Sequence, residues 1–526
     1  MSKFYLGIDI GSFETKGVLV DDSFQVVRTC AVKHIMENPA PNYFEHDAEK
    51  VWWHDFCTVS KQLIREHGIQ AEEIAGVGAS VLGCDCLPVD ENCKPLRKAI
   101  LYGIDARSQK EAEWLTQHYG PEGVLARFGH PICSDDVAAK ILWIKNHEPE
   151  VYEKTFKFLT GSSYITAKLT GNFVIDQFLA KAAFRPLYRE DGTINKTECT
   201  LFCRPDQLCQ CRVVTEIAGT VTEQAAAETG LKAGTPVITG TGDSTSEAVS
   251  VGIVEPGELM FQFGSSLFFY YCASHEVKDP RVHGGNYTVP GTFSVSGGTN
   301  AAGTLTRWVR DTLFGDLVKE QELGGRDAYE AMMDYLPDSS KGLVCLPYLA
   351  GERMPINDPN AKGVLFGLTL EHDRGHIYRA ALEAVACSLT QNVRLLEDVG
   401  LPVSQVIAVG GGTKNSAWMQ IVADVLGKPV VIPAVTVGAS YGDALMAALG
   451  TGTLADFTQL KSMVRTERTY HPNPERHQAY QTLREVYDAL YSATRELMYR
   501  RFISQYVTFH KKQSQIPTVT PISFTN

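Results

Sequence analysis

One carboxylate in this chain, that of Asp243, lies at a predicted strand-to-helix turn, a position from which a side chain can act as a general base. Asp243 lies in the segment 235–247, TPVITGTGDSTSE, after a short apolar run that predicts a buried strand and before residues that predict a helix. The residues from Ser244 to Glu247 fit a capping box, in which Ser244 caps the helix. Asp243 would then be free to face a cleft and accept a proton from a hydroxyl group. Aspartate is itself a preferred cap, and from this segment alone that structural role is the more common one.

Two other segments predict tight turns of small residues between apolar strands. Gly11 and Ser12 lie in the first turn. Gly264 and Ser265 lie in the second, after Asp243. Backbone N–H groups and hydroxyls of such turns can surround a phosphate, because no bulky side chain intervenes. A single hairpin of this kind is more often an ordinary turn, but two of them favour a phosphate site.

A run of three glycines, 410–412, marks a third turn. It follows four apolar residues and precedes a predicted helix with Trp418 and Val425 on its apolar face and Gly427 at its end. Glycines at a strand-to-helix turn let a flat ring or a phosphate lie against bare backbone beside a helix N-terminus. Close packing of the strand on the helix is the alternative. The pattern is neither a Walker loop nor a dinucleotide-binding GxGxxG turn.

Together these segments resemble the FGGY family of carbohydrate kinases, which belongs to the actin-like ATPase superfamily. The resemblance covers residues 4–451. Its most specific part is the segment 363–383, GVLFGLTLEHDRGHIYRAALE, which fits the second signature of the family, and 346–355, LPYLAGERMP, lies just before it. Residues 140–146, KILWIKN, resemble the core of the first signature, whereas the residues before Lys140 do not fit it. The resemblance implies an α/β protein with two ribonuclease-H-like domains and a cleft between them, which transfers a phosphoryl group from MgATP to a sugar hydroxyl.

The resemblance also implies roles for individual residues. Asp243 matches the catalytic base, and Asp9 matches the acidic residue near the metal and the phosphates, so both would face Mg²⁺. The remaining matches form the ATP site: Gly11, Ser12 and Lys16 in the first phosphate hairpin, Gly264 and Ser265 in the second, and Gly303, Gly411, Gly412 and Ser416 on the nucleotide side. Phosphoryl transfer requires mainly positioning, a metal and a base for the attacking hydroxyl, which agrees with these assignments.

The sugar side departs from the family at two positions. The segment 77–83 matches the place where many xylulose kinases of this family carry a Gln-Met-His-Gly run. Leu82 occupies the position of the histidine, so an apolar residue replaces a polar one. Ser244 stands where an amide residue often follows the catalytic aspartate. Both positions belong to the sugar site by resemblance, and sugar recognition at Leu82 stays open.

A pattern that the family keeps lies at residues 100–107. Asp105 and Arg107 form the Asp-x-Arg pair, and Tyr102 replaces a usual tryptophan. An aromatic face beside a carboxylate suits a polyol, because the ring can contact C–H groups while Asp105 accepts from hydroxyls. An ordinary ion pair on the domain surface is the alternative.

Composition and charge restrict the partners of the chain. It has 526 residues, with 49 basic and 61 acidic side chains and a formal net charge of -12. This balance argues against a nucleic-acid surface. No apolar run reaches the length of a membrane span, and the N-terminus lacks the pattern of a signal peptide. We expect a cytoplasmic protein with a small-molecule sugar as its partner and no membrane contact, and whether it forms a homodimer stays open.

The order of the motifs predicts the domain boundaries. We expect an N-terminal domain at 1–250, with the sugar side and the first phosphate hairpin, and a C-terminal domain at 251–505, with the nucleotide side. A final amphipathic helix is predicted at 483–498. The polar, proline-containing residues 506–526 predict a disordered tail.

The chain has 13 cysteines, of which four lie close together at positions 199, 203, 209 and 211. Their spacing is not the paired C-x-x-C of structural zinc sites. A variable loop is therefore the favoured interpretation of this stretch, and a metal site the less favoured one.

The expected activity is a sugar kinase, and D-xylulose is the substrate we expect first. Another ketose, a polyol or a sugar acid, such as ribulose, a tetritol or gluconate, is the alternative within the family. A nucleotide-binding clamp of the actin or chaperone kind, without sugar chemistry, is the alternative from a different class.

Overall fold

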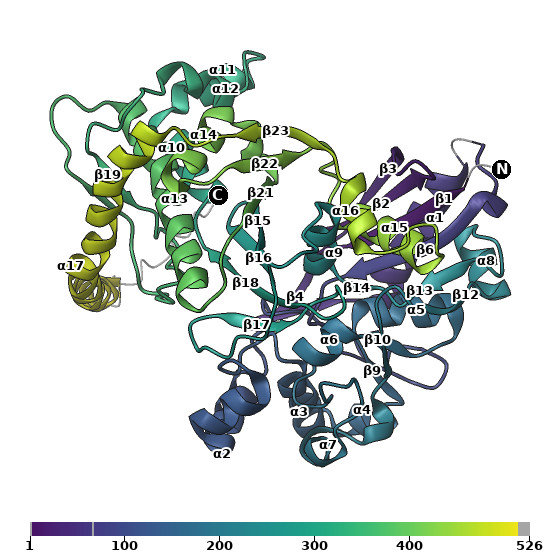
Figure 1. The fold of residues 1–526 in the computed structure, drawn as a ribbon. Helices are drawn as coiled ribbons and strands as arrows, with labels where there is room; N and C mark the ends of the chain where they lie inside the picture. The colour runs from purple at the N-terminus through teal and green to yellow at the C-terminus, as the bar shows by residue number, and fades with distance from the viewer. Residues whose placement is uncertain (1–2, 66–67, 514–526) are drawn as a thin grey trace, which may run out of the picture.

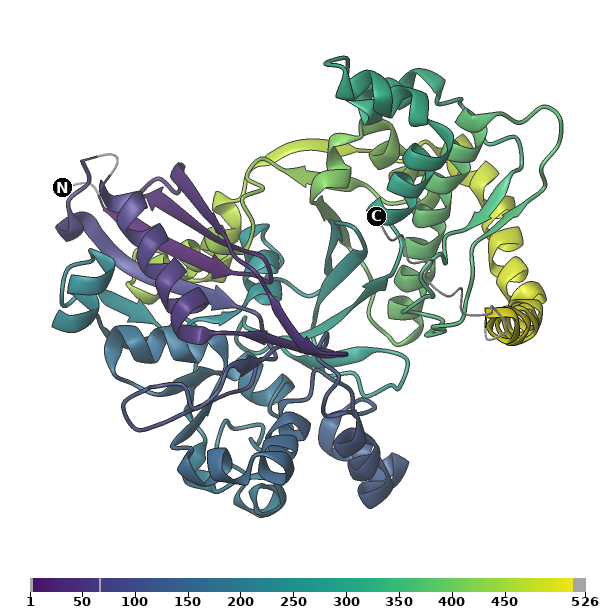
Figure 2. The same ribbon diagram turned by 180° about the vertical axis from the view of Figure 1, so that it is seen from behind.

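The computed structural model of the chain describes residues 3–65 and 68–513, with side chains up to residue 500. It has two lobes, each built around a mixed β-sheet with helices on its faces (Figure 1). The first lobe contains the N-terminal half of the chain, and most of the C-terminal half forms the second lobe. Figure 2 shows the same arrangement from behind.

The sheet of the first lobe has the strand order β12-β13-β6-β1-β2-β3, and β14 pairs with β6. Three antiparallel strands, β1 to β3, continue into two strands, β6 and β13, that are parallel to β1. The strands of this sheet are β1 Phe4–Ile10, β2 Glu14–Asp21, β3 Val26–Lys33, β6 Ile74–Val81, β12 Ile217–Thr220, β13 Pro236–Ile238 and β14 Thr241–Gly242.

The sheet of the second lobe repeats this order as β17-β18-β16-β15-β21-β22-β23. Its antiparallel strands β18, β16 and β15 again continue into two parallel strands, β21 and β22. The strands are β15 Glu258–Phe263, β16 Leu267–Ala273, β17 His283–Asn286, β18 Phe293–Thr299, β21 Gln405–Val409, β22 Val430–Pro433 and β23 Thr466–Tyr470. Three antiparallel strands followed by two parallel ones form a ribonuclease-H-like sheet, so the predicted fold class is confirmed.

Helices and short strands complete both lobes. In the N-terminal half the helices are α1 His54–Arg65, α2 Gln109–Phe128, α3 Val137–His147, α4 Pro149–Lys154, α5 Gly161–Thr170, α6 Gln177–Ala182, α7 Lys196–Phe202, α8 Glu223–Thr229 and α9 Asp243–Ser250. In the C-terminal half they are α10 Gly303–Leu313, α11 Gly315–Glu322, α12 Ala328–Met332, α13 Arg374–Asp398, α14 Ser416–Leu426, α15 Ala439–Gly450, α16 Phe457–Met463 and α17 Pro474–Gln513. The short strands are β4 Glu37–Ala40, β5 Tyr43–His46, β7 Leu87–Val89, β8 Ala99–Ile100, β9 Lys157–Leu159, β10 Val174–Asp176, β11 Gln210–Arg212, β19 Val344–Leu346 and β20 Val364–Phe366.

Helix α15 crosses from the second half of the chain to the first lobe. It follows β22 of the second sheet, yet it packs on β1 and β6 of the first sheet and against α9 (Figures 1 and 2). Strand β23 then returns the chain to the second sheet. A division of the sequence at residue 250 therefore does not separate the lobes in space, because the first lobe is completed by a helix from the C-terminal half.

The contact between α15 and the first lobe is a close approach of backbones. A Cβ atom at Gly7 of β1 would overlap the carbonyl oxygen of Ser440, and one at Gly78 of β6 would overlap that of Asp443. On the other side of α15, a Cβ atom at Gly442 would overlap the carbonyl oxygen of Ser246 in α9. These glycines have no side chain to hold the elements apart, so α15 lies directly between the sheet and α9.

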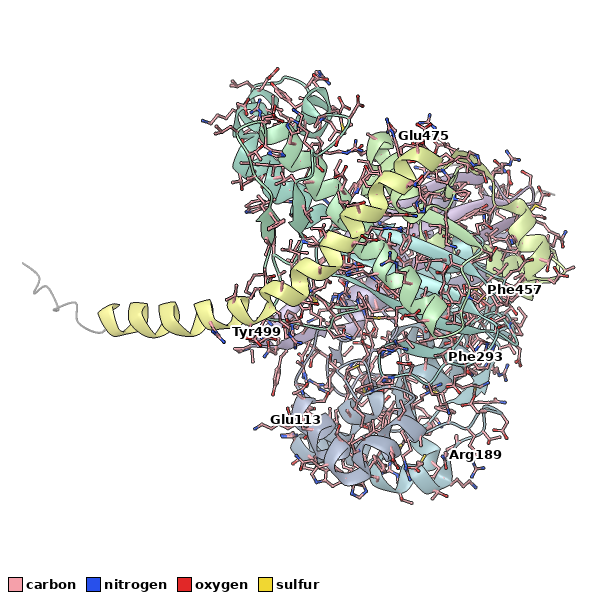
Figure 3. All side chains as sticks on the ribbon, turned by 60° about the vertical axis from the view of Figure 1, so that its left-hand side comes forward. Glu113, Arg189, Phe293, Phe457, Glu475 and Tyr499 are labelled. Carbon is pink, nitrogen blue, oxygen red and sulfur yellow. The ribbon has the colours of Figure 1, made fainter. Side chains whose placement is uncertain are left out.

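The C-terminal helix is longer than predicted. Helix α17 begins at Pro474 and extends to Gln513, well beyond the predicted end at residue 498. The first part of the predicted tail, residues 506–513, is therefore helical, and residues 514–526 lie outside the described residues. Figure 3 shows α17 following the second lobe from Glu475 and then continuing past Tyr499 away from the molecule. Within the described ranges, no helix has the length and apolar character that a membrane span requires.

We expect Gly442→Ala to destabilise the protein by about 1–3 kcal/mol, the typical cost of overpacking a close contact. Because α9 carries Asp243, turnover should fall as well. Chemical unfolding and steady-state kinetics measure the two effects. Gly315→Ala is the matched control, since a Cβ atom at Gly315 meets no other atom within 4 Å. Equal stability of the two variants would show that the α9–α15 contact tolerates separation.

Candidate active site

A cavity of about 800 Å³ lies between the two lobes. We call it the interlobe cavity. Its first-lobe wall includes side chains of both predicted sites, and its second-lobe wall is formed by the antiparallel strands of the second sheet and by Arg353. The lining residues that the sequence predicted are Asp9, Ser12, Lys16, Leu82, Tyr102, Asp243 and Ser244. The structure therefore brings together the predicted base, the first phosphate hairpin and part of the predicted sugar side.

Asp243 is the first residue of α9 and faces the interlobe cavity. Burial raises the pKa of its carboxyl group to about 6, while a hydrogen bond from the backbone N–H of Ser244, 2.7 Å from Oδ1, acts in the opposite direction. A partly buried carboxylate with a raised pKa is a better proton acceptor than a solvated one, which is the property a general base needs.

The predicted capping box is wrong. The cap of α9 is Gly242, which makes no side-chain cap bond, and the helix starts two residues earlier than the sequence predicted. Because Gly242 pairs with Val81 of β6, the chain leaves the sheet directly before Asp243. Asp243 is consequently not the cap either, and Glu247 lies one helical turn further on, where it also lines the cavity.

Four carboxyl groups lie near one another on the first-lobe side of the cavity, and three of them, Asp9, Asp243 and Glu247, line it. Burial, and then repulsion from Asp243, Asp443 and Glu247, raises the pKa of Asp9 well above its ordinary value. Burial also raises the pKa of Glu247 to about 7, and Lys16 partly offsets this increase. Burial raises the pKa of Asp443 to about 8. Crowded carboxyl groups of this kind favour a bound cation, because it compensates their mutual repulsion.

This donor set fits a magnesium ion that is also held by phosphate. In the described part of the chain, no group of three or more His, Cys, Asp or Glu residues is arranged to hold a metal ion alone. Mg²⁺ in kinases is usually bound by one or two carboxylates, water and substrate phosphates, so it does not need such a group. Asp9 and Asp243, both on the cavity wall, match that requirement.

Asp443 is a buried residue of this cluster that the sequence analysis missed. Its Oδ1 accepts from Ser246 Oγ and its Oδ2 from Ser80 Oγ, each at 2.7 Å. Ser80 Oγ also lies 3.1 Å from Oδ1 of Asp9. Asp443 therefore ties α15 to both α9 and β6. The available signal in the sequence was a single aspartate directly before the apolar run 444–449.

The first predicted phosphate hairpin is confirmed as a turn between β1 and β2. The N–H of Gly11 donates to the carbonyl of Glu14 at 3.0 Å and closes it. His34 Nε2 donates to the Gly11 carbonyl at 2.9 Å, and His46 Nε2 donates to the Ser12 carbonyl at 3.1 Å. With its carbonyl groups held by these two rings, the turn keeps Ser12 on the cavity wall.

Tyr102 connects this hairpin to the predicted sugar side. Its hydroxyl lies 3.2 Å from Ser12 Oγ, and both residues line the cavity. The predicted phosphate turn and the predicted aromatic sugar contact are thus neighbours in one site.

The second hairpin, between β15 and β16, packs on the start of α10. The N–H of Gly303 donates to the carbonyl of Gly264 at 3.0 Å, and the N–H of Thr304 donates to the carbonyl of Ser265 at 2.8 Å. A Cβ atom at Gly303 would lie 2.5 Å from the Gly264 oxygen, so the contact requires glycine there. Gly264, Ser265 and Gly303 form one unit, which does not line the interlobe cavity but leaves the turn exposed.

The glycines of the run 410–412 differ in their surroundings: one allows close packing of strand and helix, and another leaves backbone accessible to a ligand. A Cβ atom at Gly412 would lie 2.8 Å from Phe263 Cβ and 2.9 Å from the Trp418 ring, so this glycine allows strand and helix to pack closely. Gly411 faces open space and leaves bare backbone accessible. Ser416 is the exposed first residue of α14, whose cap is Asn415.

Asp105 and Arg107, which the sequence prediction assigned to the sugar side, lie away from the interlobe cavity. Their side chains are 0% and 1% exposed, and neither residue lines the cavity. Oδ2 of Asp105 accepts from Arg107 Nη2 at 2.7 Å and from the N–H of Phe44 at 2.6 Å. Arg107 also donates to Glu45 at 2.8 Å. Asp105 and Arg107 thus form a buried ion pair, whereas the alternative interpretation of the sequence placed an ion pair on the domain surface.

Two of the four clustered cysteines lie in regular elements, and among the described residues no group of three or more His, Cys, Asp or Glu is arranged to hold a metal ion. Cys199 lies in α7 and Cys203 directly follows it, while Cys211 lies in β11. All 13 cysteines are free thiols. The segment consists of short regular elements packed on the core of the first lobe.

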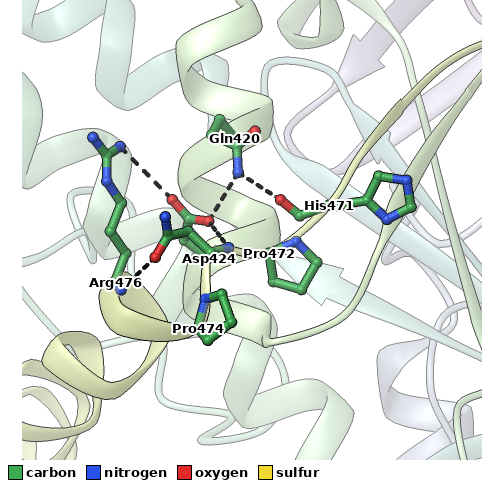
Figure 4. A pocket seen from close by; sticks show the side chains of 7 residues that line it. Gln420, Asp424, His471, Pro472, Pro474 and Arg476 are labelled. Atoms are coloured by element: carbon green, nitrogen blue, oxygen red, sulfur yellow. Dashed lines mark hydrogen bonds and ion pairs between the residues drawn. The ribbon is translucent and has the colours of Figure 1, made fainter.

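A second pocket, of about 470 Å³, lies where α14 meets the start of α17 (Figure 4). Asp424 is fully buried there, and its Oδ1 accepts from Gln420 Nε2 and from the N–H of Asn473, both at 2.8 Å. Arg476 Nη1 is 3.9 Å from Oδ2. These bonds attach α17 to α14, and the pocket shares no lining residue with the interlobe cavity.

The duplicated sheets and the carboxylate-lined cavity between the lobes define a two-lobed α/β protein of the actin-like ATPase class. Residues 4–250 match the family model described as FGGY family of carbohydrate kinases, N-terminal domain, and residues 259–451 match the model of the C-terminal domain. The chain therefore belongs to the FGGY family of carbohydrate kinases and is a sugar kinase.

Characterised relatives differ in the substrate that their names give. The chain is 27% identical over 499 residues to the xylulose kinase of Bacillus subtilis (strain 168), covering 94% of this chain and 98% of that protein. It is 27% identical over 496 residues to the gluconokinase of the same organism, covering 93% and 95%. The crystal structure of xylulose kinase from Rhodospirillum rubrum has a TM-score of 0.85 at 30% identity, covering 94% of this chain and 100% of that one.

We expect Asp105→Asn to destabilise the protein by about 3–5 kcal/mol, because it removes one partner of a buried ion pair and leaves Arg107 incompletely compensated. The Michaelis constant for the sugar should stay within about threefold of the wild-type value in the folded fraction. Denaturant unfolding and steady-state kinetics test both statements.

The matched control is Asp279→Asn, in the exposed Asp-x-Arg pair with Arg281, where the N···O distance is 2.8 Å. An exposed pair contributes about 0–1 kcal/mol, so this variant should be nearly as stable as the wild type. A large rise in the sugar Michaelis constant with unchanged stability for Asp105→Asn would return Asp105 to the sugar site.

Proposed function

We propose that this protein transfers the γ-phosphate of MgATP to a hydroxyl of a small neutral sugar, with D-xylulose as the first candidate. The observation that supports this most directly is the position of Asp243 on the interlobe cavity, together with Asp9, Ser12 and Tyr102. A phosphate held by the first hairpin and a sugar held against Tyr102 would be adjacent there, because Ser12 and Tyr102 lie side by side.

The residues divide the work of the reaction as follows. Asp243 accepts the proton of the attacking hydroxyl, for which burial has raised the pKa of its carboxyl group in the right direction. The hairpin with Gly11, Ser12 and Lys16 holds phosphate oxygens through backbone N–H groups, a hydroxyl and a cation. When bound, Mg²⁺ at Asp9 and Asp243 would neutralise charge on the phosphates.

The nucleotide would extend toward the second lobe. The exposed turn of Gly264 and Ser265 lies beside the N-terminus of α10, and Gly411 offers bare backbone near the N-terminus of α14. Helix N-termini carry partial positive charge and free N–H groups, so both suit an anionic or polar ligand.

The choice of D-xylulose is supported by the similarity to xylulose kinases. Gluconate is the competing substrate, because the chain is also 27% identical to a gluconokinase. ADP release measured across ketoses, polyols and sugar acids decides between them. Highest kcat/KM for D-xylulose supports the first candidate, and highest kcat/KM for gluconate would replace it. Absence of ADP release with every sugar would overturn the proposed phosphoryl transfer.

Asp243→Asn should reduce turnover by about 10²–10⁴-fold, the contribution of a positioned general base, with little change in ATP affinity. Coupled ADP release measures turnover, and calorimetric titration measures ATP affinity. Asp22→Asn, in the exposed turn after β2, is the control for removal of one carboxylate. More than half of wild-type turnover in Asp243→Asn would exclude a base at this position.

Ser265→Leu should weaken ATP binding and leave sugar binding unchanged, because a bulky side chain in the second turn would obstruct the phosphates. Calorimetric titration with each ligand separates the two effects. Ser274→Leu is the matched control, since Ser274 is an exposed serine just beyond the opposite end of β16. If both variants bind ATP as the wild type does, the second hairpin does not belong to the nucleotide site.

A further inference from the structure

The loop between α2 and α3 forms part of the interlobe cavity. It holds the residues before Lys140 that do not fit the first signature of the family, and it places His130, Asp135 and Asp136 on the cavity wall. Departures from a family pattern that face the substrate cavity are candidates for specificity.

Two residues of the loop have structural partners. Ser134 Oγ donates to the carbonyl of Gly103 at 2.7 Å and fixes the loop to the segment that carries Tyr102. Oδ2 of Asp136 accepts from the N–H of Cys133 at 2.8 Å, and Asp136, only 1% exposed, precedes the first turn of α3. Both side chains hold the loop in place.

Asp135 differs from these neighbours. Its carboxylate makes no hydrogen bond and no ion pair with the residues that the structure describes, although the side chain is partly buried and lines the cavity. It rests against the α-carbon of Gly103, where a Cβ atom would lie 2.5 Å from Oδ1. A rigid loop thus presents one unpaired acceptor to the cavity, in space that the glycine leaves free.

The position of Asp135 relative to the base follows from Tyr102. Burial is the main cause that raises the pKa of the Tyr102 hydroxyl, and the charges of both Asp243 and Asp135 contribute to the increase. Tyr102 is thus within electrostatic range of both carboxylates. A substrate with its reacting hydroxyl at Asp243 could therefore extend along Tyr102 to Asp135.

Two histidines near Asp135 provide no positive charge to a ligand. His130 and His283 stack with ring centroids 3.9 Å apart, and burial lowers the pKa of both rings, which keeps them neutral near pH 7. Arg353 is a cation on the second-lobe wall of the same cavity, where burial lowers the pKa of its guanidinium and the charge of Asp135 partly offsets this effect. Its Nη2 is also held by the second lobe, where it donates to the carbonyl groups of Leu267 and Thr299 at 3.3 and 3.1 Å. A second carboxylate placed beside Asp135 would meet like charge.

Resting on the proposed sugar-kinase reaction, we propose that Asp135 is a specificity-determining residue that accepts hydrogen bonds from hydroxyls at the substrate end remote from the transferred phosphate. It selects neutral ketoses and polyols over sugar acids. A site that accepts a hydrogen bond from a substrate hydroxyl discriminates strongly against ligands that lack this hydroxyl. When such a ligand binds, the acceptor in the site is left without a hydrogen-bond partner.

The test compares neutral sugars with aldonates of the same chain length in the wild type, Asp135→Asn and Asp135→Ser. The wild type should prefer the neutral member by at least about 100-fold in kcat/KM. Asp135→Asn should lower kcat/KM for that member about 10–100-fold, through the Michaelis constant, and reduce the preference at least about 10-fold. The Michaelis constant for ATP should not change. Asp22→Asn is the exposed control and should behave as the wild type.

Calorimetric binding of each sugar without ATP gives a readout independent of turnover. Weaker binding of the neutral sugar to both Asp135 variants, at an unchanged melting temperature, supports the proposal. A wild-type preference for aldonates, or an unchanged preference in both variants, would overturn it while leaving the kinase activity intact. Absence of turnover with every sugar would instead overturn the proposed function, and the binding comparison would still decide the role of Asp135.

Discussion

The structure depends on one backbone contact, the packing of α15 between the first sheet and α9. Gly7, Gly78 and Gly442 allow it, since any side chain there would overlap a carbonyl oxygen of the neighbouring element. The surrounding core contains apolar residues of both halves of the chain, such as Val18 and Ala444. Because α15 begins after a strand of the second sheet, this contact also joins the two lobes.

The same contact places the carboxyl groups of the site. Asp9 lies near the C-terminal end of β1, and Asp243 is the first residue of α9. Asp443 on α15 accepts hydrogen bonds from one serine on β6 and one on α9. Burial of these groups is unfavourable for their charged forms, so their pKa values rise. These raised pKa values agree with the proposed roles of Asp243 as a proton acceptor and of Asp9 near a bound cation.

Local patterns in the sequence predicted those parts of the site that local structure determines. Both hairpins and the Gly411 turn lie where small residues interrupt apolar strands, and they form as expected. The capping box failed because pairing of Gly242 with β6, which is far away in sequence, sets the start of α9. Asp105 lies away from the cavity for a similar reason, because the N–H of Phe44, 61 residues earlier, donates to its buried carboxylate.

The departures from the family pattern become connected only in three dimensions. Leu82 places an apolar side chain on the first-lobe wall where a polar one is usual, and Asp135 supplies an unpaired carboxylate to the same cavity from a different loop. In sequence the two positions are more than 50 residues apart, and neither alone indicates a compensation. Both positions line one cavity. If Asp135 accepts from hydroxyls as proposed, a polar contact absent after β6 is replaced by one before α3, and the proposed base and phosphate hairpin keep their supporting contacts. In this proposal, the reaction and the substrate preference thus belong to separate parts of the first lobe.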